Sequence, residues 1–355
     1  MLKLVVFRLA LILTWMSFLV PAGDFVGYAA AADCQIQKAP GKFEFRESKS
    51  KSGNPSNVGI VPTGFVTLED TIPVVHGIDV SKYQDNVDFQ RIKECGARFA
   101  YVRLSAGSNP DNELEYPSLW ANAKSVGLIV GPYHNLRLKD PNIPFQSLSV
   151  EAKEALGIEN EAHARKQAQL FMSRLQDMLL LDPDGLLPDK NSLGEAYLPA
   201  VLDISWRPQA RFSAEDQRDY GLIYKRGICA WIDEFTNDPR FSKQKLILFT
   251  SAYIYKDYQI GTAACGVSKL SVWITDHTVD GGRSMDNPRA ATRDVVELLC
   301  RDSDGKDRCI IQQYTSFGGF ALFQDRSGLD MNRFYGTMDD LKRLLQHATK
   351  SKERG

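Results

Sequence analysis

The chain has 355 residues, of which 43% are hydrophobic, and its formal net charge is -1. This length and apolar content suffice for a sizeable core, and one α/β barrel domain commonly fills about 250 residues. The balanced charge gives no electrostatic reason to expect nucleic acid or an anionic membrane as a partner, so we expect neither.

The first segment of the chain has the pattern of a secretory signal peptide over residues 1–32. Basic residues precede an apolar run at 9–20, and four alanines at 29–32 offer a small-residue cleavage site. An uncleaved N-terminal anchor is the alternative, but Pro21 ends the run and leaves it short for a membrane span. We therefore predict cleavage after the alanines, a periplasmic or secreted protein, and no stable membrane insertion of the mature chain.

All six cysteines lie beyond the predicted signal peptide, and an even count in an exported chain predicts disulfide bonds. Cys300 and Cys309 are near enough in sequence to close a local loop. The pairing of the other four stays open. The sequence contains no Cys-x-x-Cys or histidine-rich spacing typical of a metal site, and we expect neither a metal nor another cofactor.

Residues 33–72 lack a regular apolar pattern. The stretch 49–57 is rich in Ser, Lys, Asn, Gly and Pro, which is typical of a flexible linker. We predict an extended N-terminal arm over 33–72, a folded domain over 73–348 and a frayed tail over 349–355.

Within the folded domain, apolar runs typical of strands are followed in several places by stretches typical of helices. Eight such runs with helices between several of them predict a closed barrel. Some connections are too short for a full helix, so the expected fold is an irregular TIM-like (β/α) barrel, with a polar insertion at 278–309. The predicted strands cover 74–80, 98–104, part of 128–138, 198–204, 246–250, 270–274, 310–314 and 328–331. The predicted helices cover 88–95, 119–126, 161–181, 213–235 and 337–347.

Four of the predicted strands end in polar residues, which are Asp79, His134, Asp203 and Asp330. The carboxyl ends of the strands are where (β/α) barrels keep their chemistry. Capping of a strand would explain any one of these residues alone. Four of them, three being aspartates, favour a shared site.

Four motifs follow one another along the chain. They are Gly-Ile-Asp-Val-Ser-Lys-Tyr-Gln at 77–84, Gly-Leu-Ile-Val-Gly-Pro-Tyr-His at 127–134, Leu-Pro-Ala-Val-Leu-Asp-Ile at 198–204 and Leu-Asp-Met-Asn at 329–332. In this order they resemble the motifs of the family 25 glycoside hydrolases, the Chalaropsis-type lysozymes. The resemblance covers about residues 74–346 and is strongest at 77–84. The resemblance implies a barrel that binds peptidoglycan and cleaves its β-1,4 bond between N-acetylmuramic acid and N-acetylglucosamine.

The resemblance also implies catalytic roles for Asp79, Asp203 and Asp330. The family's usual proton donor is the Glu of an Asp-x-Glu motif on the fourth strand, and this chain has Ser205 there. Glycoside cleavage needs an acid to protonate the leaving oxygen, and a serine hydroxyl is far too weak an acid for this role. An active muramidase would therefore need a substitute acid.

Two residues just after the sixth strand, Asp276 and His277, are candidates for this substitute, although a loop position without a catalytic role is the simpler explanation of each. The alternative function is binding of peptidoglycan or another glycan without hydrolysis, with Trp206 and Tyr133 as apolar platforms unless they belong to the core. A third possibility is a scaffold that uses the insertion as a partner surface. The residues predicted to contact a glycan are Tyr133, His134, Trp206, Asp276, His277 and Gln313.

Overall fold

The computed structural model describes residues 37–39, 66–68, 73–84, 87–141, 143–180, 196–205, 214–275, 299–301, 305–318 and 328–347. The chain divides into two units, Met1–Ala32 and Asp33–Gly355, and all described residues belong to the second. The predicted signal peptide, the linker at 49–57, most of the insertion at 278–309 and the tail at 349–355 lie outside the described residues.

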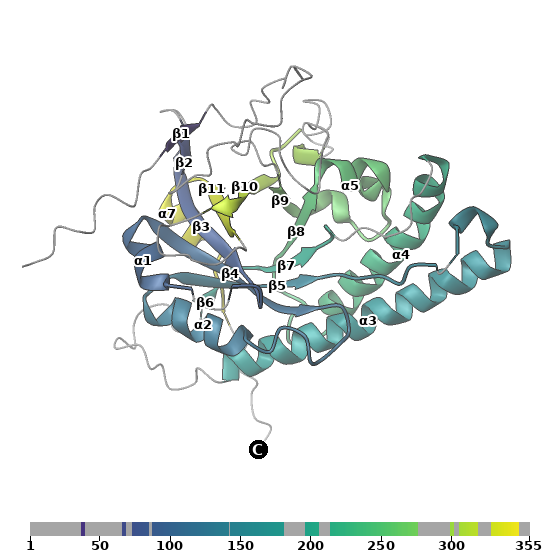
Figure 1. Ribbon diagram of the computed structural model, residues 1–355, viewed down its shortest axis with the longest axis horizontal. Helices are drawn as coiled ribbons and strands as arrows, with labels where there is room; N and C mark the ends of the chain where they lie inside the picture. Colours follow the sequence, from purple (N-terminus) through teal and green to yellow (C-terminus); the bar gives the residue numbers. More distant parts are fainter. Residues whose placement is uncertain are drawn as a thin grey trace, which may run out of the picture. The chain divides into compact units, whose positions relative to one another are not determined.

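Eight strands close into a barrel in the order β10-β11-β3-β4-β5-β7-β8-β9 (Figure 1). Each of the eight predicted strands supplies one of them, and the predicted irregular (β/α) barrel is confirmed. The barrel strands are β3 (Val74–Val80), β4 (Ala97–Ala106), β5 (Ile129–Asn135), β7 (Ala200–Asp203), β8 (Leu246–Ser251), β9 (Ser271–Thr275), β10 (Cys309–Gly318) and β11 (Leu329–Tyr335).

Strand β11 makes the barrel irregular, because it pairs antiparallel with both of its neighbours, β10 and β3. The other seven strands are parallel to one another. The first residues of β11 therefore lie at the end of the barrel where the parallel strands finish, which we call the mouth. In the register of this pair, Asp330 lies opposite Asp79.

Helices surround the barrel, and α3 and α4 pack against each other along one side of it (Figure 1). The long helix α3 begins at Val150, earlier than predicted. The last helix is shorter than predicted, because residues 346–347 pair with another strand instead. Within the described residues, the helices are α1 (Phe89–Glu94), α2 (Tyr116–Ser125), α3 (Val150–Leu180), α4 (Ala214–Asn237), α5 (Ala252–Asp257) and α7 (Met338–Lys342), with short 3₁₀ turns at Phe145–Ser147, Ile260–Thr262 and Val267–Lys269.

Two small sheets lie outside the barrel. Strand β6 (Ala196–Tyr197) pairs antiparallel with β12 (Gln346–His347). Within the predicted N-terminal arm, β1 (Gln37–Ala39) and β2 (Val66–Leu68) pair in parallel.

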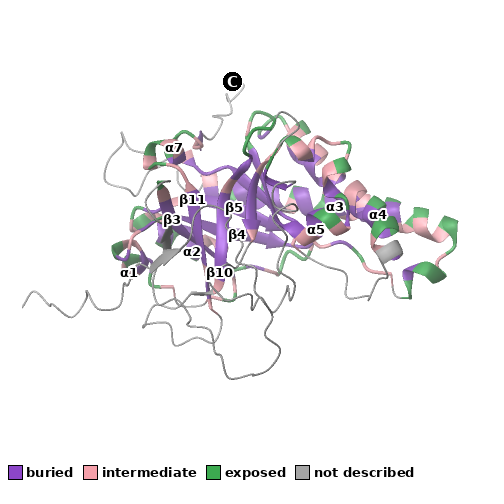
Figure 2. Cartoon of the chain, turned by 90° about the horizontal axis from the view of Figure 1, so that it is seen from above, coloured by how far each residue is buried: buried purple, intermediate pink, exposed green. Residues whose placement is uncertain are grey.

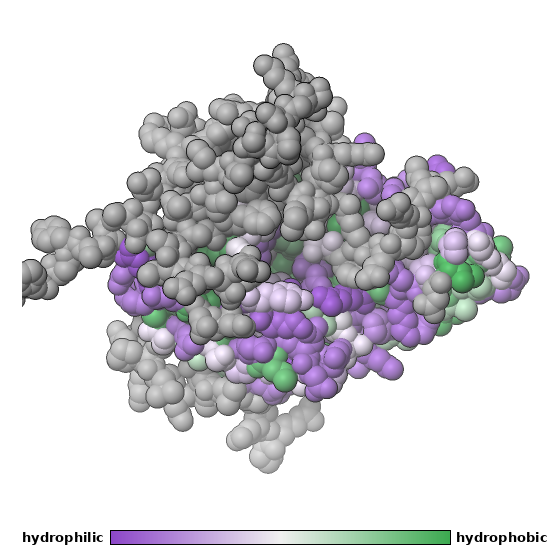
Figure 3. Space-filling model, viewed as in Figure 1, coloured by the Kyte–Doolittle hydropathy of each residue, from purple (hydrophilic) through white to green (hydrophobic). Residues whose placement is uncertain are grey.

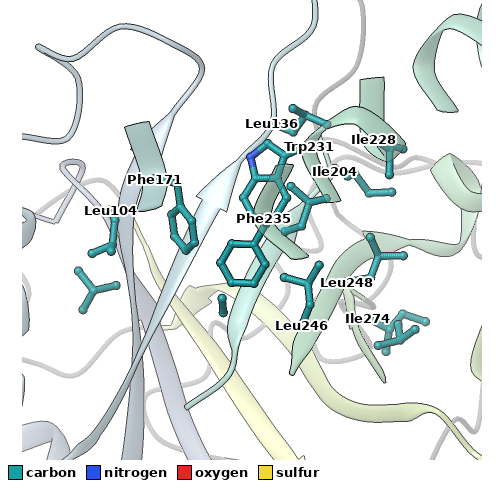
Figure 4. Packing of buried hydrophobic residues seen from close by; sticks show 14 of the residues in the cluster. Leu104, Leu136, Phe171, Ile204, Ile228, Trp231, Phe235, Leu246, Leu248 and Ile274 are labelled. Atoms are coloured by element: carbon teal, nitrogen blue, oxygen red, sulfur yellow. The ribbon is translucent and has the colours of Figure 1, made fainter. Parts of the chain in front are cut away.

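The barrel wall separates two apolar layers, since successive side chains of a strand point to opposite faces. The inner layer fills the barrel with large side chains that include Phe99, Tyr101 and Trp273. The outer layer lies between the wall and the helices, where Phe171 and Trp231 pack beside strand residues (Figure 4). Burial is concentrated in the strands and on the inward sides of the helices (Figure 2). The barrel is therefore a filled core, and a ligand is restricted to its ends.

Disulfide bonds join Cys229 to Cys265 and Cys300 to Cys309, and the second confirms the predicted local loop. Cys95 is also disulfide-bonded.

The described surface over α2 and α3 is mostly hydrophilic on the face shown in Figure 3. None of the helices in the described part of the chain combines the length and apolar composition needed to cross a bilayer.

Candidate active site

The inner face of the barrel changes from apolar to charged at the mouth. On β3, Val75 belongs to the inner apolar layer, and Asp79 lies four residues further along the same face. On β7, Asp203 follows the inward-facing Val201 by two residues. Strand alternation thus directs both carboxyl groups into the mouth, where both are buried.

The carboxylate of Asp79 is held by two amide groups. Its Oδ1 accepts hydrogen bonds from Asn332 Nδ2 at 2.7 Å and from Gln313 Nε2 at 3.1 Å. Burial raises the pKa of Asp79 to about 6, and the charge of Asp203 adds to this increase, although the amide donors and Arg103 oppose it. Asp79 therefore titrates nearer to neutrality than an ordinary aspartate.

Asp330 is the cross-strand neighbour of Asp79 and is partly exposed at the mouth. Burial of the carboxyl group and the charge of Asp79 raise its pKa well above the usual range. A hydrogen bond between the Asp330 and Asp79 side chains raises it further, because that bond requires a proton on one of the two carboxyls. The pair consequently favours retention of one proton.

Asp203 accepts hydrogen bonds on both carboxylate oxygens. Asn135 Nδ2 donates to Oδ2 at 2.7 Å, and the backbone N–H of Ser205 donates to Oδ1 at 2.7 Å. Burial raises the pKa of Asp203, while the Ser205 side chain and backbone, Asn135 and Arg103 lower it. Ser205 thus contacts Asp203 through its backbone and its side chain.

A buried cation, Arg103 on β4, lies among these carboxylates and lowers the pKa of each of the three aspartates. Its Nη2 is 2.8 Å from Oε1 of Glu113, whose side chain is fully buried. The guanidinium also lies over the rings of Tyr83 and Tyr133, at 5.2 Å and 5.9 Å from the ring centroids. The sequence interpretation missed Arg103, although its position two residues after Tyr101 places it on the inner face.

Glu113 is held in an uncommon backbone conformation, with a φ of 61°. Its Oε2 accepts a hydrogen bond from the Lys82 backbone N–H at 3.0 Å. Arg174 of α3 fixes the same loop by donating to the backbone carbonyls of Pro110 and Asn112. No local sequence signal identified Glu113, because its contact with Arg103 depends on how this loop folds back over the barrel.

The structure brings five predicted site residues together at the mouth: Asp79, Asp203, Asp330, Gln313 and Tyr133. Tyr133 is buried in the inner layer against Trp273. Three predicted residues, Trp206, Asp276 and His277, lie outside the described residues. Asn135 and Asn332, which orient the carboxylates, were not predicted as site residues.

His134 is placed differently from the prediction. Its neighbour Tyr133 points into the barrel, so the His134 side chain points outward and is fully buried beneath α3 and α4. Its Nδ1 accepts from Ser105 Oγ at 2.8 Å, its Nε2 donates to Gln167 Oε1 at 3.1 Å, and its ring stacks on Trp231. Burial lowers the pKa of His134 to about 3. A neutral core histidine in this layer does not reach a ligand at the mouth, and the predicted glycan contact is corrected accordingly.

The mouth thus combines a protonated carboxyl pair with a second carboxylate that receives hydrogen bonds on both oxygens. Such a combination can donate a proton and can stabilise a nearby positive charge. In the described ranges, no group of three or more His, Cys, Asp and Glu side chains has the arrangement of a metal site.

Comparison with known proteins finds a local similarity to the family that the sequence motifs resemble. Residues 78–147 match the model of the glycosyl hydrolases family 25. An autolytic lysozyme from Clostridium acetobutylicum is 32% identical over 90 residues, which is 23% of this chain and 28% of that protein. Lysozyme M1 from Streptomyces globisporus is 35% identical over 63 residues, which is 18% of this chain and 21% of that protein. The chain thus matches about a quarter of the length of these curated relatives.

A solved structure of a family 25 glycosyl hydrolase from Bacillus anthracis is similar to this chain with a TM-score of 0.45 and 18% sequence identity. The similarity covers 76% of this chain and 92% of that chain.

The sequence comparisons confirm the resemblance to family 25 over residues 78–147. This segment contains Asp79, Arg103 and Asn135, and it ends before Asp203 and Asp330.

Proposed function

We propose that the chain is an exported glycoside hydrolase that cleaves the β-1,4 bond of peptidoglycan between N-acetylmuramic acid and N-acetylglucosamine. The observation that carries this proposal is the placement of Asp79, Asp203 and Asp330 together at the mouth of a closed barrel. The family match over 78–147 and two relatives named as lysozymes support the choice of substrate.

Glycoside cleavage requires one group that protonates the leaving oxygen and another that supports the positive charge developing on the sugar. Asp203 suits the second role. Both of its oxygens accept hydrogen bonds and Arg103 lies nearby, and these interactions favour its ionised form against the effect of burial. The first role requires a carboxyl group that keeps its proton, which the Asp79–Asp330 pair offers.

In this proposal Ser205 has a positioning role in place of the acid that the family resemblance implies at its position. Its backbone N–H and its side chain both contact the Asp203 carboxylate. Two donors on a carboxylate fix its orientation and stabilise its charge. Ser205 therefore supports Asp203 and does not itself protonate the sugar.

Export of the chain is supported by its disulfide bonds, since such bonds persist in oxidising compartments. It also agrees with the signal peptide predicted at residues 1–32. The proposed location is therefore the periplasm or the extracellular medium, where peptidoglycan is accessible.

The decisive experiment measures reducing-end release from purified peptidoglycan. The protein is recovered from an export-competent host and compared with Asp203→Asn and with Asp219→Asn, which changes an exposed carboxylate on α4. We expect release by the wild type and by Asp219→Asn, and loss of release in Asp203→Asn. Wild-type protein that releases no sugar under any condition of pH would contradict the proposal.

Binding without hydrolysis is the second candidate function, and the serine at position 205 is the observation that favours it. In that case the wild type would be retained on insoluble peptidoglycan and would release nothing, while Ser205→Glu would gain activity. Absence of both release and retention would exclude both sugar-directed functions.

A further inference from the structure

We propose that Asp330 is the proton donor of the reaction and that Asp79 is its ionised partner. The pair would replace the glutamic acid that the family resemblance implies at position 205. This inference rests on the proposed glycosidase function, and it names a catalytic group that the comparisons do not assign.

The antiparallel direction of β11 creates the pair. Asp330 is the second residue of β11 and lies directly opposite Asp79, near the end of β3. Facing residues of an antiparallel pair have Cβ atoms about 4.5–5.5 Å apart, which allows their carboxyl groups to meet. The two side chains are hydrogen-bonded. Because two such close carboxyls cannot both ionise readily, the pair retains one proton.

The hydrogen bonds to Asp79 determine which carboxyl holds this proton. The Asn332 and Gln313 amides both donate to Asp79 Oδ1, at 2.7 Å and 3.1 Å. Amide N–H groups can only donate, so they favour the ionised form of Asp79. Asp79 is buried with 4% exposure, whereas Asp330 is partly exposed at the mouth. The proton thus resides on the more exposed residue of the pair.

Other charged and titratable groups face the pair from three further strands of the barrel. Arg103 of β4 favours ionisation of both carboxyls, whereas Asp203 of β7 disfavours it. Tyr133 of β5 lies close enough to interact electrostatically with all three aspartates and stays protonated, because burial raises its pKa. Arg103 is partly neutralised by its ion pair with Glu113. Asp330 therefore keeps its proton although a cation lies in the same layer.

The chemical step uses this proton directly. As the bond between the anomeric carbon and the bridging oxygen breaks, its electron pair stays on the oxygen, and that oxygen takes the proton of Asp330. The positive charge that develops on the sugar ring is stabilised by Asp203. Water then adds to the anomeric carbon and returns one proton to the Asp330 carboxylate, so that the products differ from the substrate by one water molecule.

The test compares two substrates in wild type, Asp330→Asn and the exposed-site control Asp219→Asn. The natural substrate is purified peptidoglycan, whose leaving oxygen needs a proton. The second substrate is a dinitrophenyl glycoside of the same sugars, whose leaving group departs without one. Since a general acid contributes about 10²–10⁴-fold, we expect Asp330→Asn to lose at least about 100-fold on peptidoglycan and less than about 10-fold on the aryl glycoside.

The pH dependence provides a readout that a merely structural role would not change. Wild-type activity on peptidoglycan should fall as the pH rises through the raised pKa of Asp330, and activity on the aryl glycoside should show no such fall. Undiminished peptidoglycan cleavage by Asp330→Asn, or equal losses on both substrates, would overturn the assignment and leave the proposed function standing. A wild type inactive on both substrates would instead contradict the proposed function.

Discussion

Two pairs of adjacent strands at the mouth place a buried aspartate opposite another polar residue, and we call the line where two such strands meet a seam. At the β3–β11 seam, Asp79 faces Asp330, and at the β5–β7 seam, Asp203 faces Asn135. The first partner is a carboxyl group and the second is an amide. A facing carboxyl holds a shared proton, whereas a facing amide donates to the carboxylate and favours its charge. The difference shows how similar strand ends can favour opposite protonation states of an aspartate.

Arg103 lies near both seams, and its removal should have the largest effect. We expect Arg103→Met to lower the free energy of unfolding by about 3–5 kcal/mol, because it leaves the Glu113 carboxylate buried without its cation. Denaturant unfolding measures this loss. The double variant Arg103→Met/Glu113→Leu should be less destabilised than the sum of the single variants. A loss below about 1 kcal/mol in Arg103→Met would show that the ion pair is not needed to hold the mouth together.

At the β5–β7 seam, Asp203→Asn should reduce peptidoglycan cleavage by about 10²–10³-fold, the usual effect of removing one preorganised electrostatic contact. The aryl glycoside should lose as much, because its sugar also develops positive charge. This equal loss distinguishes Asp203 from Asp330. Retention of aryl glycoside cleavage in Asp203→Asn would mean that the two seams do not divide the roles as proposed.

At the β3–β11 seam, Asp79 should make stability depend on pH. Its pKa is about 6 in the folded protein and 3.8 in its ordinary state, so the folded protein binds a proton more tightly. The stabilising contribution of Asp79 to the free energy of unfolding is therefore fully present below the ordinary pKa, and it is lost as the pH rises through 6. Relative to wild type, Asp79→Asn should gain about 1–3 kcal/mol of unfolding free energy between pH 4 and pH 7. Unfolding curves at the two pH values measure this gain, and a difference that stays constant would refute it.

The smallest expected effect concerns Ser205. Ser205→Ala removes the hydroxyl contact to Asp203 and keeps the backbone N–H at 2.7 Å. We expect a change of about 1 kcal/mol, the usual value of one hydrogen bond, which corresponds to less than about a tenfold loss of activity. The acid limb of the pH–rate profile should move to higher pH, because Asp203 loses a donor that lowers its pKa. A loss as large as that of Asp203→Asn would assign Ser205 a catalytic role.

The sequence by itself determined the barrel strands and the acidic character of the mouth. Apolar runs that end in Asp79, Asp203 and Asp330 identified strands and strand ends, because burial and side-chain alternation are local properties of the chain. The alternation of side chains along a strand also predicts that Arg103 points inward and His134 outward. The sequence interpretation did not apply this rule to these two residues. These errors concern which face a residue occupies, which the pattern along one strand can decide.

Only the tertiary structure decided which residues face each other. The direction of β11 brings Asp330 to Asp79 across 251 positions of sequence, and the loop after β4 brings Glu113 to Arg103. Register across a seam depends on packing and hydrogen bonds between distant segments, which no local pattern contains. The sequence identified the acidic residues, and the tertiary structure decided which neighbour each of them has. Since the protonation of each aspartate depends on that neighbour, only the tertiary structure sets the electrostatics of the mouth.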